Sequence, residues 1–329
     1  MPSWGELLAD INDQAQAHGG LVNLDDMRGA HLRRVQECTD NDVVLYATDF
    51  LGSAGGIQTA INLQDLQGFM EVMRGLKGPG LDLILHTPGG QAEATERIVR
   101  YIRSKFSTLR VIVPFAAMSA GTMWAMAADE IIMGKHSQLG PIDPQVTLGN
   151  SLQMPAGALI EQFKGAIDEC AQSPERITGW LPTLQQYPPG LLNFCESATQ
   201  LSKKLVTEWL GQYMLKDNSD EAERAAEWLA NDKEHLSHSR PITREQLIDH
   251  GIRVTALEDN QDLQDAVLSV FHMATHTFTM STAVKIIENH MGRRYVQHGG
   301  QMVLQQVPQG IPPQGAPPQG LLGELQPRP

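Results

Sequence analysis

The sequence has few cysteines, no surplus of positive charge and no long apolar run. Its three cysteines, Cys38, Cys170 and Cys195, lie far apart in a chain of 329 residues, so the sequence indicates neither a disulfide framework nor a CxxC zinc site. A formal net charge of −13 argues against nonspecific binding to nucleic acid or to an anionic membrane. No run approaches the roughly 18 apolar residues of a membrane helix, and the acidic N-terminus is unlike a signal peptide. We therefore expect a cytoplasmic protein with no integral membrane segment and no nucleic-acid partner.

Sequence motifs for cofactors are also missing. There is no phosphate loop, no GxGxxG fingerprint and no basic stripe. His272 and His276 have the four-residue spacing of two zinc ligands on a helix, but no HExxH pattern and no third ligand accompany them. We expect a packed or exposed pair of histidines there. The sequence thus predicts no metal and no cofactor.

The remaining composition is typical of a globular protein. The most informative part of the sequence is the stretch at residues 81–144. Hydrophobic residues make up 41% and charged residues 19% of the chain. Two apolar runs, 81–85 and 109–115, are each followed by a glycine-bearing turn and then by a run of helix formers. Buried strands that alternate with helices indicate a parallel α/β sheet. In such sheets chemistry gathers at the carboxyl ends of the strands, where both turns lie.

Each turn has a structural and a functional interpretation. Gly89 and Gly90 allow positive φ angles and close backbone approach, which suits either an ordinary turn or a loop that offers N–H groups to a ligand. Ser119 opens an apolar helix, so it is either an N-cap or a reactive hydroxyl. Small neighbours, Ala116, Ala117, Ala120 and Gly121, leave room beside that hydroxyl.

Taken together, the motifs resemble the ClpP/crotonase superfamily. The carriers are PGG, a helix, a strand, MSAGT at residues 118–122, an alanine-rich helix, DEII at 129–132 and SQLGPI at 137–142. The pattern is most similar to signal-peptide-peptidase-A-like serine peptidases, and within them to the serine dehydrogenase proteinase family. This resemblance implies a spiral of ββα units, with Ser119 as nucleophile. It also implies an oxyanion hole formed by the Gly90 and Ala120 amides with Gly89 adjoining, where each donor typically contributes about 3 kcal/mol.

The general base is not settled by the sequence. Relatives use a histidine with an aspartate, or a lysine. Ile142, flanked by Pro141 and Asp143, stands about 23 residues beyond Ser119, where a ClpP-type histidine is expected. The lysine of the membrane-protease relatives has no counterpart at residues 187–190. We favour His238, which lies near the position of the ClpP-type aspartate, because the ordinary pKa of a histidine suits a base. Lys164 stays open as the alternative, and weaker candidates are Lys135, His136, Lys203 and Lys204.

The expected organisation places this catalytic region between extensions. Residues 1–40 form a helical N-terminal extension, and residues 41–258 form the ClpP/crotonase-like domain with a helical insertion at about 150–235. Residues 237–254 resemble the closing motif of the superfamily, with a capping box at Thr243 and Gln246 and a stop at Gly251. Residues 259–300 are expected to be helical, including 257–280 and 283–290. The tail at 301–329 repeats Pro-Gln-Gly and is expected to be disordered.

The sequence therefore predicts a serine peptidase that forms an acyl-enzyme on Ser119, acts on peptides or proteins and self-assembles. Two alternatives stay open. One is a crotonase-type acyl-CoA enzyme that uses the same oxyanion hole, and the other is a catalytically silent scaffold of the same fold. No nicotinamide site supports the dehydrogenase part of the family name.

Overall fold

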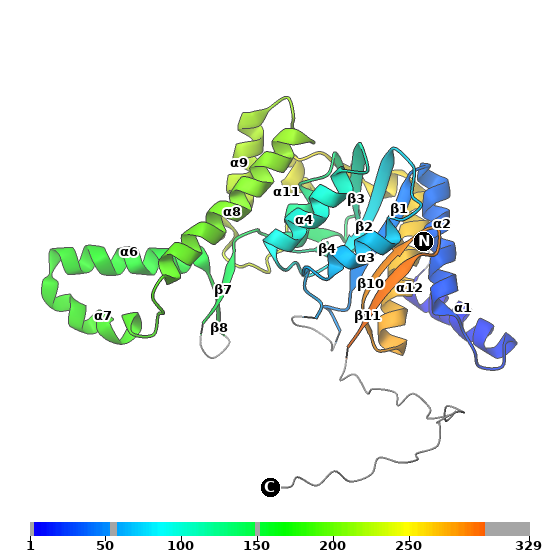
Figure 1. Ribbon diagram of the computed structural model, residues 1–329, viewed down its shortest axis with the longest axis horizontal. Coiled ribbons are helices and arrows are strands. Elements are labelled where there is room, and N and C mark those ends of the chain that lie inside the picture. Colours follow the sequence, from blue (N-terminus) through cyan, green and yellow to red (C-terminus); the bar gives the residue numbers. More distant parts are fainter. Residues whose placement is uncertain (1–2, 53–57, 149–151, 300–329) are drawn as a thin grey trace, which may run out of the picture. The chain divides into compact units, whose positions relative to one another are not determined.

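A seven-stranded sheet forms the centre of the protein (Figure 1). The computed structural model describes residues 3–52, 58–148 and 152–299. The sheet order is β11-β10-β1-β2-β3-β5-β9. Its strands are β1 (Asp42–Thr48), β2 (Gly80–His86), β3 (Thr108–Val113), β5 (Glu130–Met133), β9 (Val254–Ala256), β10 (Ala283–Asn289) and β11 (Arg294–His298). Strands β1, β2, β3, β5 and β9 pair in parallel, whereas β10 and β11 pair antiparallel.

A second layer of short extended segments follows the main strands. β4 (Ala116–Ala117) pairs in parallel with β6 (Gln138–Leu139). Isolated bridges join Ile61 to Gly90, Thr87 to Ala117 and Leu139 to Ile242. Except for Ile242, these segments come after a main-sheet strand, and most of them lead into a helix, so a ββα unit recurs along the chain. The expected fold, an α/β spiral of ββα units with extra helical segments, is confirmed.

Helices cover both faces of the main sheet (Figure 1). One face carries α3 (Asp65–Val72), α4 (Ala92–Arg103) and α5 (Ala120–Ala125). α4 shows why: its buried residues Ala94, Thr95, Ile98, Val99 and Ile102 recur at helical spacing. The other face carries α2 (Leu24–Thr39) and α12 (Gln261–Met280), and α1 (Trp4–Ala17) packs on α12. Of the N-terminal helices, α2 thus packs directly on the sheet, and α1 packs on α12.

The helical insertion begins after a small hairpin. Its elements are β7 (Gln145–Leu148), β8 (Leu152–Pro155), α6 (Ala156–Gln172), η1 (Pro174–Arg176), α7 (Ile177–Leu184), α8 (Leu191–Gln212), α9 (Ser219–Leu229) and α10 (Asp232–His235). α8 packs on α4, α5 and α9, whereas α6 and α7 lie away from the sheet (Figure 1). None of the α7 residues is buried, although the helix is apolar. α11 (Arg244–Asp249) then carries the expected capping box, and Gly251 has a φ of +80°.

The expectation of a helix at residues 283–290 is wrong. That segment is β10, which lies between β1 and β11 and is buried along its whole length. The sequence AVKIIEN is rich in β-branched residues and too short to separate a buried strand from a helix by periodicity alone. The C-terminal extension therefore supplies two strands of the main sheet as well as the helix α12. The expected tail lies outside the described residues.

Across the described ranges, no helix combines the length and apolar character that a bilayer span requires. All three cysteines are free thiols.

Candidate active site

Ser119 lies in a strained turn between β4 and α5. Its φ of 52° and ψ of −117° fall outside the regions that side-chain-bearing residues favour, which costs on the order of 1–3 kcal/mol. Backbone bonds hold the turn: the Gly121 amide donates to Met118 O at 2.8 Å, and the Met123 amide donates to Ser119 O at 3.0 Å. Ser119 occupies the N-cap position, but its hydroxyl makes no capping bond. The hydroxyl is therefore not used in the way that an ordinary N-cap serine uses it.

Gly89 brings the second turn against Ser119. Its φ is +98°, and a Cβ placed there would lie 2.6 Å from Met118 O and 2.8 Å from Ser119 Cβ. Gly90, with a φ of +154°, has no room either, because a Cβ would overlap the backbone of Ile61. Glycine is thus required at both positions by conformation and by contact.

The amides of this loop have different partners. The Gly89 amide donates to Thr87 Oγ1 at 3.2 Å. The parallel bridge is made by its neighbours: the Ile61 amide donates to Gly89 O at 2.7 Å, and the Gln91 amide donates to Ile61 O at 2.9 Å. The Gly90 amide is directed away from Ile61, since alternate residues of an extended chain face opposite sides. Within the described part of the chain, the Gly90 amide and the first α5 amide, that of Ala120, have no hydrogen-bond acceptor.

His238 forms a hydrogen bond with a buried carboxylate. Its Nδ1 donates to Asp143 Oδ1 at 2.9 Å, and Gln145 Nε2 donates to the other carboxylate oxygen at 2.6 Å. The Asp143 side chain is 5% exposed and the His238 side chain 25%. A proton on Nδ1 leaves Nε2 of the neutral ring as an acceptor, which is the tautomer a general base needs. Asp143 was not singled out as a site residue from the sequence, and its place beside Ile142 was the available signal.

Three contacts bring the chain around Ser119 toward this pair. Gly140 packs on Met118, and a Cβ at Gly140 would lie 3.6 Å from Met118 Cα. The Gly140 amide donates to Thr122 Oγ1 at 3.0 Å, which in turn donates to Ala117 O at 2.9 Å. Leu139 exchanges two backbone bonds with Ile242. Asp143 follows Leu139 and Gly140 in the chain, and His238 precedes Ile242. In the described structure no hydrogen bond links Ser119 Oγ to the His238 ring.

The other candidates have surface or packing contacts. Lys164 is exposed on α6. Lys203 pairs with Glu227 at 2.5 Å, and Lys204 lies 3.8 Å from Glu208. Lys135 and His136 are exposed after β5. These residues are not brought to Ser119 by any contact that the described structure shows.

The histidine pair on α12 is explained by packing. His276 is buried and donates through Nε2 to Trp4 O at 3.0 Å, with its ring centroid 4.3 Å from that of Trp4. Burial lowers the pKa of His272. Among the residues that the structure describes, no cluster of three histidine, cysteine or carboxylate side chains has metal-binding geometry.

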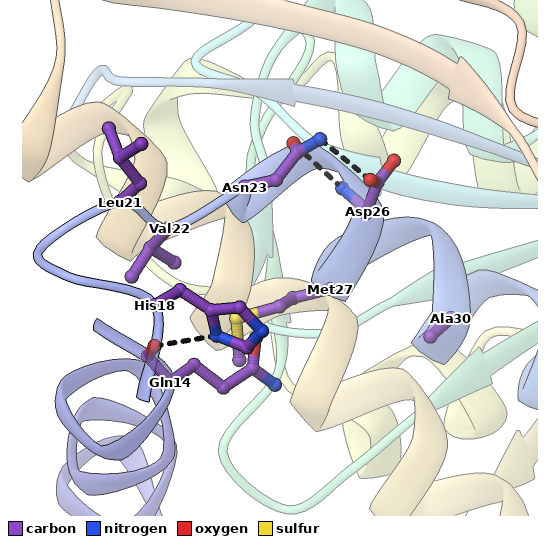
Figure 2. A pocket seen from close by; sticks show the side chains of 8 residues that line it. All are labelled: Gln14, His18, Leu21, Val22, Asn23, Asp26, Met27 and Ala30. Carbon is purple, nitrogen blue, oxygen red and sulfur yellow. Dashed lines mark hydrogen bonds between the residues drawn. The ribbon is translucent and has the colours of Figure 1, made fainter. Parts of the chain in front are cut away.

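A cavity of about 750 Å³ lies elsewhere, between α1 and α2 (Figure 2). It is lined by Gln14, His18, Leu21, Val22, Asn23, Asp26, Met27 and Ala30. Its polar groups serve the helix ends: His18 Nδ1 donates to Gln14 O at 2.9 Å, and the Asp26 amide donates to Asn23 Oδ1 at 3.2 Å (Figure 2). The lining shares no residue with Ser119, the glycine loop or the His238–Asp143 pair, so this cavity is separate from the Ser119 site.

Comparison with known proteins gives a family match. Residues 43–178 match the family of ClpP-like SDH-type serine proteinases. Two uncharacterized proteins of Methanocaldococcus jannaschii are similar: MJ1495 is 45% identical over 83 residues, and MJ0137 is 41% identical over 109 residues. These matches cover 25% and 32% of this chain. They span only 27% and 36% of the two relatives.

Two solved structures are similar at low TM-scores. The membrane-bound stomatin-specific protease 1510-N has a TM-score of 0.36 at 18% identity, over 63% of this chain and 79% of its own. ClpP1 from Listeria monocytogenes has a TM-score of 0.36 at 15% identity, over 70% of this chain and 98% of its own. Neither likeness carries an argument about function.

Proposed function

The chain carries a ClpP-like SDH-type serine proteinase segment at residues 43–178, and from this premise we propose that it is a serine peptidase. Ser119 is the nucleophile, His238 the general base and Asp143 the group that orients the base. The Gly90 and Ala120 amides are the oxyanion donors, and Gly89 supplies the close approach between the two turns.

The proposed reaction runs through an acyl-enzyme. Ser119 Oγ attacks the peptide carbonyl carbon while His238 Nε2 takes the hydroxyl proton. The carbonyl oxygen becomes an oxyanion that accepts from the Gly90 and Ala120 amides. The C–N bond then breaks, and the leaving amine takes the proton from His238. A water molecule attacks the ester, gives its proton to His238 and displaces Ser119 Oγ, which regains a proton as the acid product leaves.

One observation carries the proposal. Ser119 is held in a strained turn and its hydroxyl is not used as a cap. The Ala120 amide follows it directly, and the Gly90 amide adjoins Gly89, which packs on Ser119. Among the described residues neither amide has an acceptor. Strain of this kind persists only where the surrounding structure enforces it, and it gathers at functional sites.

The test is labelling with a fluorophosphonate probe, which needs an activated serine and no knowledge of the substrate. We expect wild-type protein to be labelled, Ser119→Ala to give no labelling, and His238→Ala to slow labelling by about 100-fold or more. Lys164→Ala is the matched control and should label at the wild-type rate. Absence of labelling of folded wild-type protein would contradict the proposal and favour an acyl-CoA enzyme or a silent scaffold of the same fold.

Self-assembly and a peptide or protein substrate are part of the proposal. The support for self-assembly is the unburied apolar surface of the insertion, where Ile167 is 62% and Phe194 60% exposed. A second copy of the chain is the occupant we propose for this surface. Light scattering should report an oligomer for wild-type protein and a smaller species for Ile167→Asp/Phe194→Asp, with Met291→Asp, an exposed apolar residue in the β10–β11 turn, as control. A monomeric wild type would contradict this part. The cytoplasmic location stays a prediction of the sequence.

A further inference from the structure

A buried ion pair grips the backbone on both sides of Ile61. Lys285 Nζ donates to Ala60 O at 2.9 Å, and Asp65 Oδ2 accepts from the Asn62 amide at 2.9 Å. Lys285 also bonds Asp65 itself, with Nζ at 2.7 and 2.9 Å from the two carboxylate oxygens. Both side chains are fully buried.

Tyr46 completes the cluster. Its hydroxyl donates to Asp65 Oδ2 at 2.8 Å. The three side chains come from β1, α3 and β10, so distant parts of the chain meet in one cluster, from which Lys285 and Asp65 bond residues 60–62. Burial lowers the pKa of Lys285, while the charge and hydrogen bonds of Asp65 oppose that shift.

The segment that this ion pair holds, residues 60–62, pairs with the proposed oxyanion loop at Gly89 and Gly90. The Ile61 carbonyl accepts from the Gln91 amide, and the Ile61 amide donates to Gly89 O. Ile61 is therefore bonded to both chain neighbours of Gly90. Gly90 also packs on the Ile61 backbone with no room for a Cβ. A displacement of residues 60–62 therefore displaces Gly90 and its free amide.

We propose that Lys285 and Asp65 are positioning residues for the oxyanion hole, acting through Ile61 on the Gly90 amide. The inference rests on the proposed function for its catalytic consequence. Replacing a buried ion pair by apolar residues is often neutral for stability, so stability alone does not explain this pair. The need to place an oxyanion donor explains the pair, because a shift of about 1 Å in a catalytic group costs on the order of 100-fold in rate.

The pair also links the site to a part of the chain outside the family match. Lys285 lies on β10, beyond residues 43–178. Three residues further along the same strand, Glu288 is equally buried and pairs with Arg28 at 2.6 Å. Glu288 points to the other face of the sheet and touches no part of the loop, which makes it a matched control.

The experiment compares full-length Lys285→Met with Glu288→Gln. The first readout is hydrogen exchange at the amides of Ile61 and Gln91, and the second is the rate of fluorophosphonate labelling. We expect Lys285→Met to speed exchange at these amides and to slow labelling by about 10-fold or more, whereas Glu288→Gln leaves both unchanged. The double variant Asp65→Asn/Lys285→Met leaves no unpaired buried charge, and it should show the same two effects.

Wild-type exchange at Ile61 and Gln91 in a folded Lys285→Met or double variant overturns the inference. The same holds for wild-type labelling rates in both of these variants. If wild-type protein is not labelled, the proposed peptidase activity fails, while the exchange readout still decides whether Lys285 holds the segment. An equal loss of protection in Glu288→Gln also overturns it, because the effect would then belong to the strand as a whole.

Discussion

Ser119 and Gly89 show how two residues divide one task. Ser119 has a positive φ, a backbone conformation that residues with a side chain disfavour. Gly89 has no side chain, and its backbone can therefore lie against Ser119. The strain at Ser119 is balanced by the bonds of the turn, and the gap at Gly89 is filled by Met118 O and Ser119 Cβ. Each residue fixes the position of the other.

Gly89→Ala should therefore abolish the site and not merely strain the loop. The new Cβ would lie against Met118 O and Ser119 Cβ, so the loop must move away from Ser119. We expect labelling to fall by about 100-fold. Gly292→Ala is the control: its φ of +85° imposes similar strain, but no atom lies within 4 Å of the new Cβ. Its labelling should match wild type, with a loss of about 1 kcal/mol in the free energy of unfolding. Equal labelling of the two variants would show that the contact is unimportant.

Asp143→Asn tests the orientation of His238. An amide in place of the carboxylate offers His238 Nδ1 a donor or an acceptor, so the ring is no longer held with its proton on Nδ1. In a serine–histidine–aspartate site the equivalent change lowers the rate by up to about 10⁴-fold. We expect a fall of about 100-fold or more in the labelling rate, with the unfolding midpoint little changed. Gln145→Ala removes the other partner of Asp143 and should have a small effect. A wild-type rate for Asp143→Asn would remove Asp143 from the mechanism.

At the scale of elements, β10 shows where the sequence fails and why. The turns at 88–90 and 118–122 were predictable because glycine and serine mark them locally, and the parallel strands were predictable because their apolar runs are short and bounded. β10 was not, because a seven-residue strand buried on both faces has no alternation to distinguish it from a helix. Its role as a partner of β1 is set by residues about 240 positions earlier, which no local pattern reports.

Two truncations test the weight of β10 and β11. A chain ending at Gly299 keeps the whole compact unit, so we expect it to unfold at the wild-type midpoint and to be labelled as the full chain is. A chain ending at Met280 loses both strands and the buried side chains of Ala283, Ile286 and Ile287, and exposes the edge of β1. We expect it to lose cooperative unfolding, measured by circular dichroism during heating. A cooperative transition near the wild-type midpoint would make the extension dispensable.

At the scale of the whole molecule, the site depends on pairs of side chains that lie far apart in the sequence. His238 meets Asp143 across 95 residues, and Lys285 meets Asp65 across 220. The resemblance to known peptidases pointed to His238 by its position relative to a closing motif, but a single sequence holds no signal that joins it to Asp143. The burial of Lys285 could not be predicted either, since a lone lysine among β-branched residues looks like an exposed position. The turns at Gly89 and Ser119 could be predicted locally and His238 through the resemblance, whereas the pairing of His238 with Asp143 and of Lys285 with Asp65 could not.

The stability of the whole protein should depend on His86 in acid. This side chain is 2% exposed among Phe50, Phe115 and Phe271, and burial lowers its pKa from 6.5 to about 3, against a smaller opposing effect of a hydrogen bond with the Ala116 backbone. Because the folded-state pKa is depressed, the unfolded chain takes up a proton below about pH 6.5 that the folded chain refuses until about pH 3. This histidine thus contributes a loss of up to about 1.4 kcal/mol per pH unit across that window as the pH falls.

His86→Phe should remove this part of the acid sensitivity. The variant keeps an aromatic ring in an aromatic cluster and has no group to protonate. Between pH 7 and pH 5 we expect wild-type protein to lose about 2 kcal/mol more of its free energy of unfolding than His86→Phe loses, measured by urea denaturation. The exposed His136 supplies the control, since His136→Gln should follow wild type. Equal pH dependence in wild type and His86→Phe would mean that the buried ring is protonated in the folded protein, or that His86 opens to solvent well before the protein unfolds.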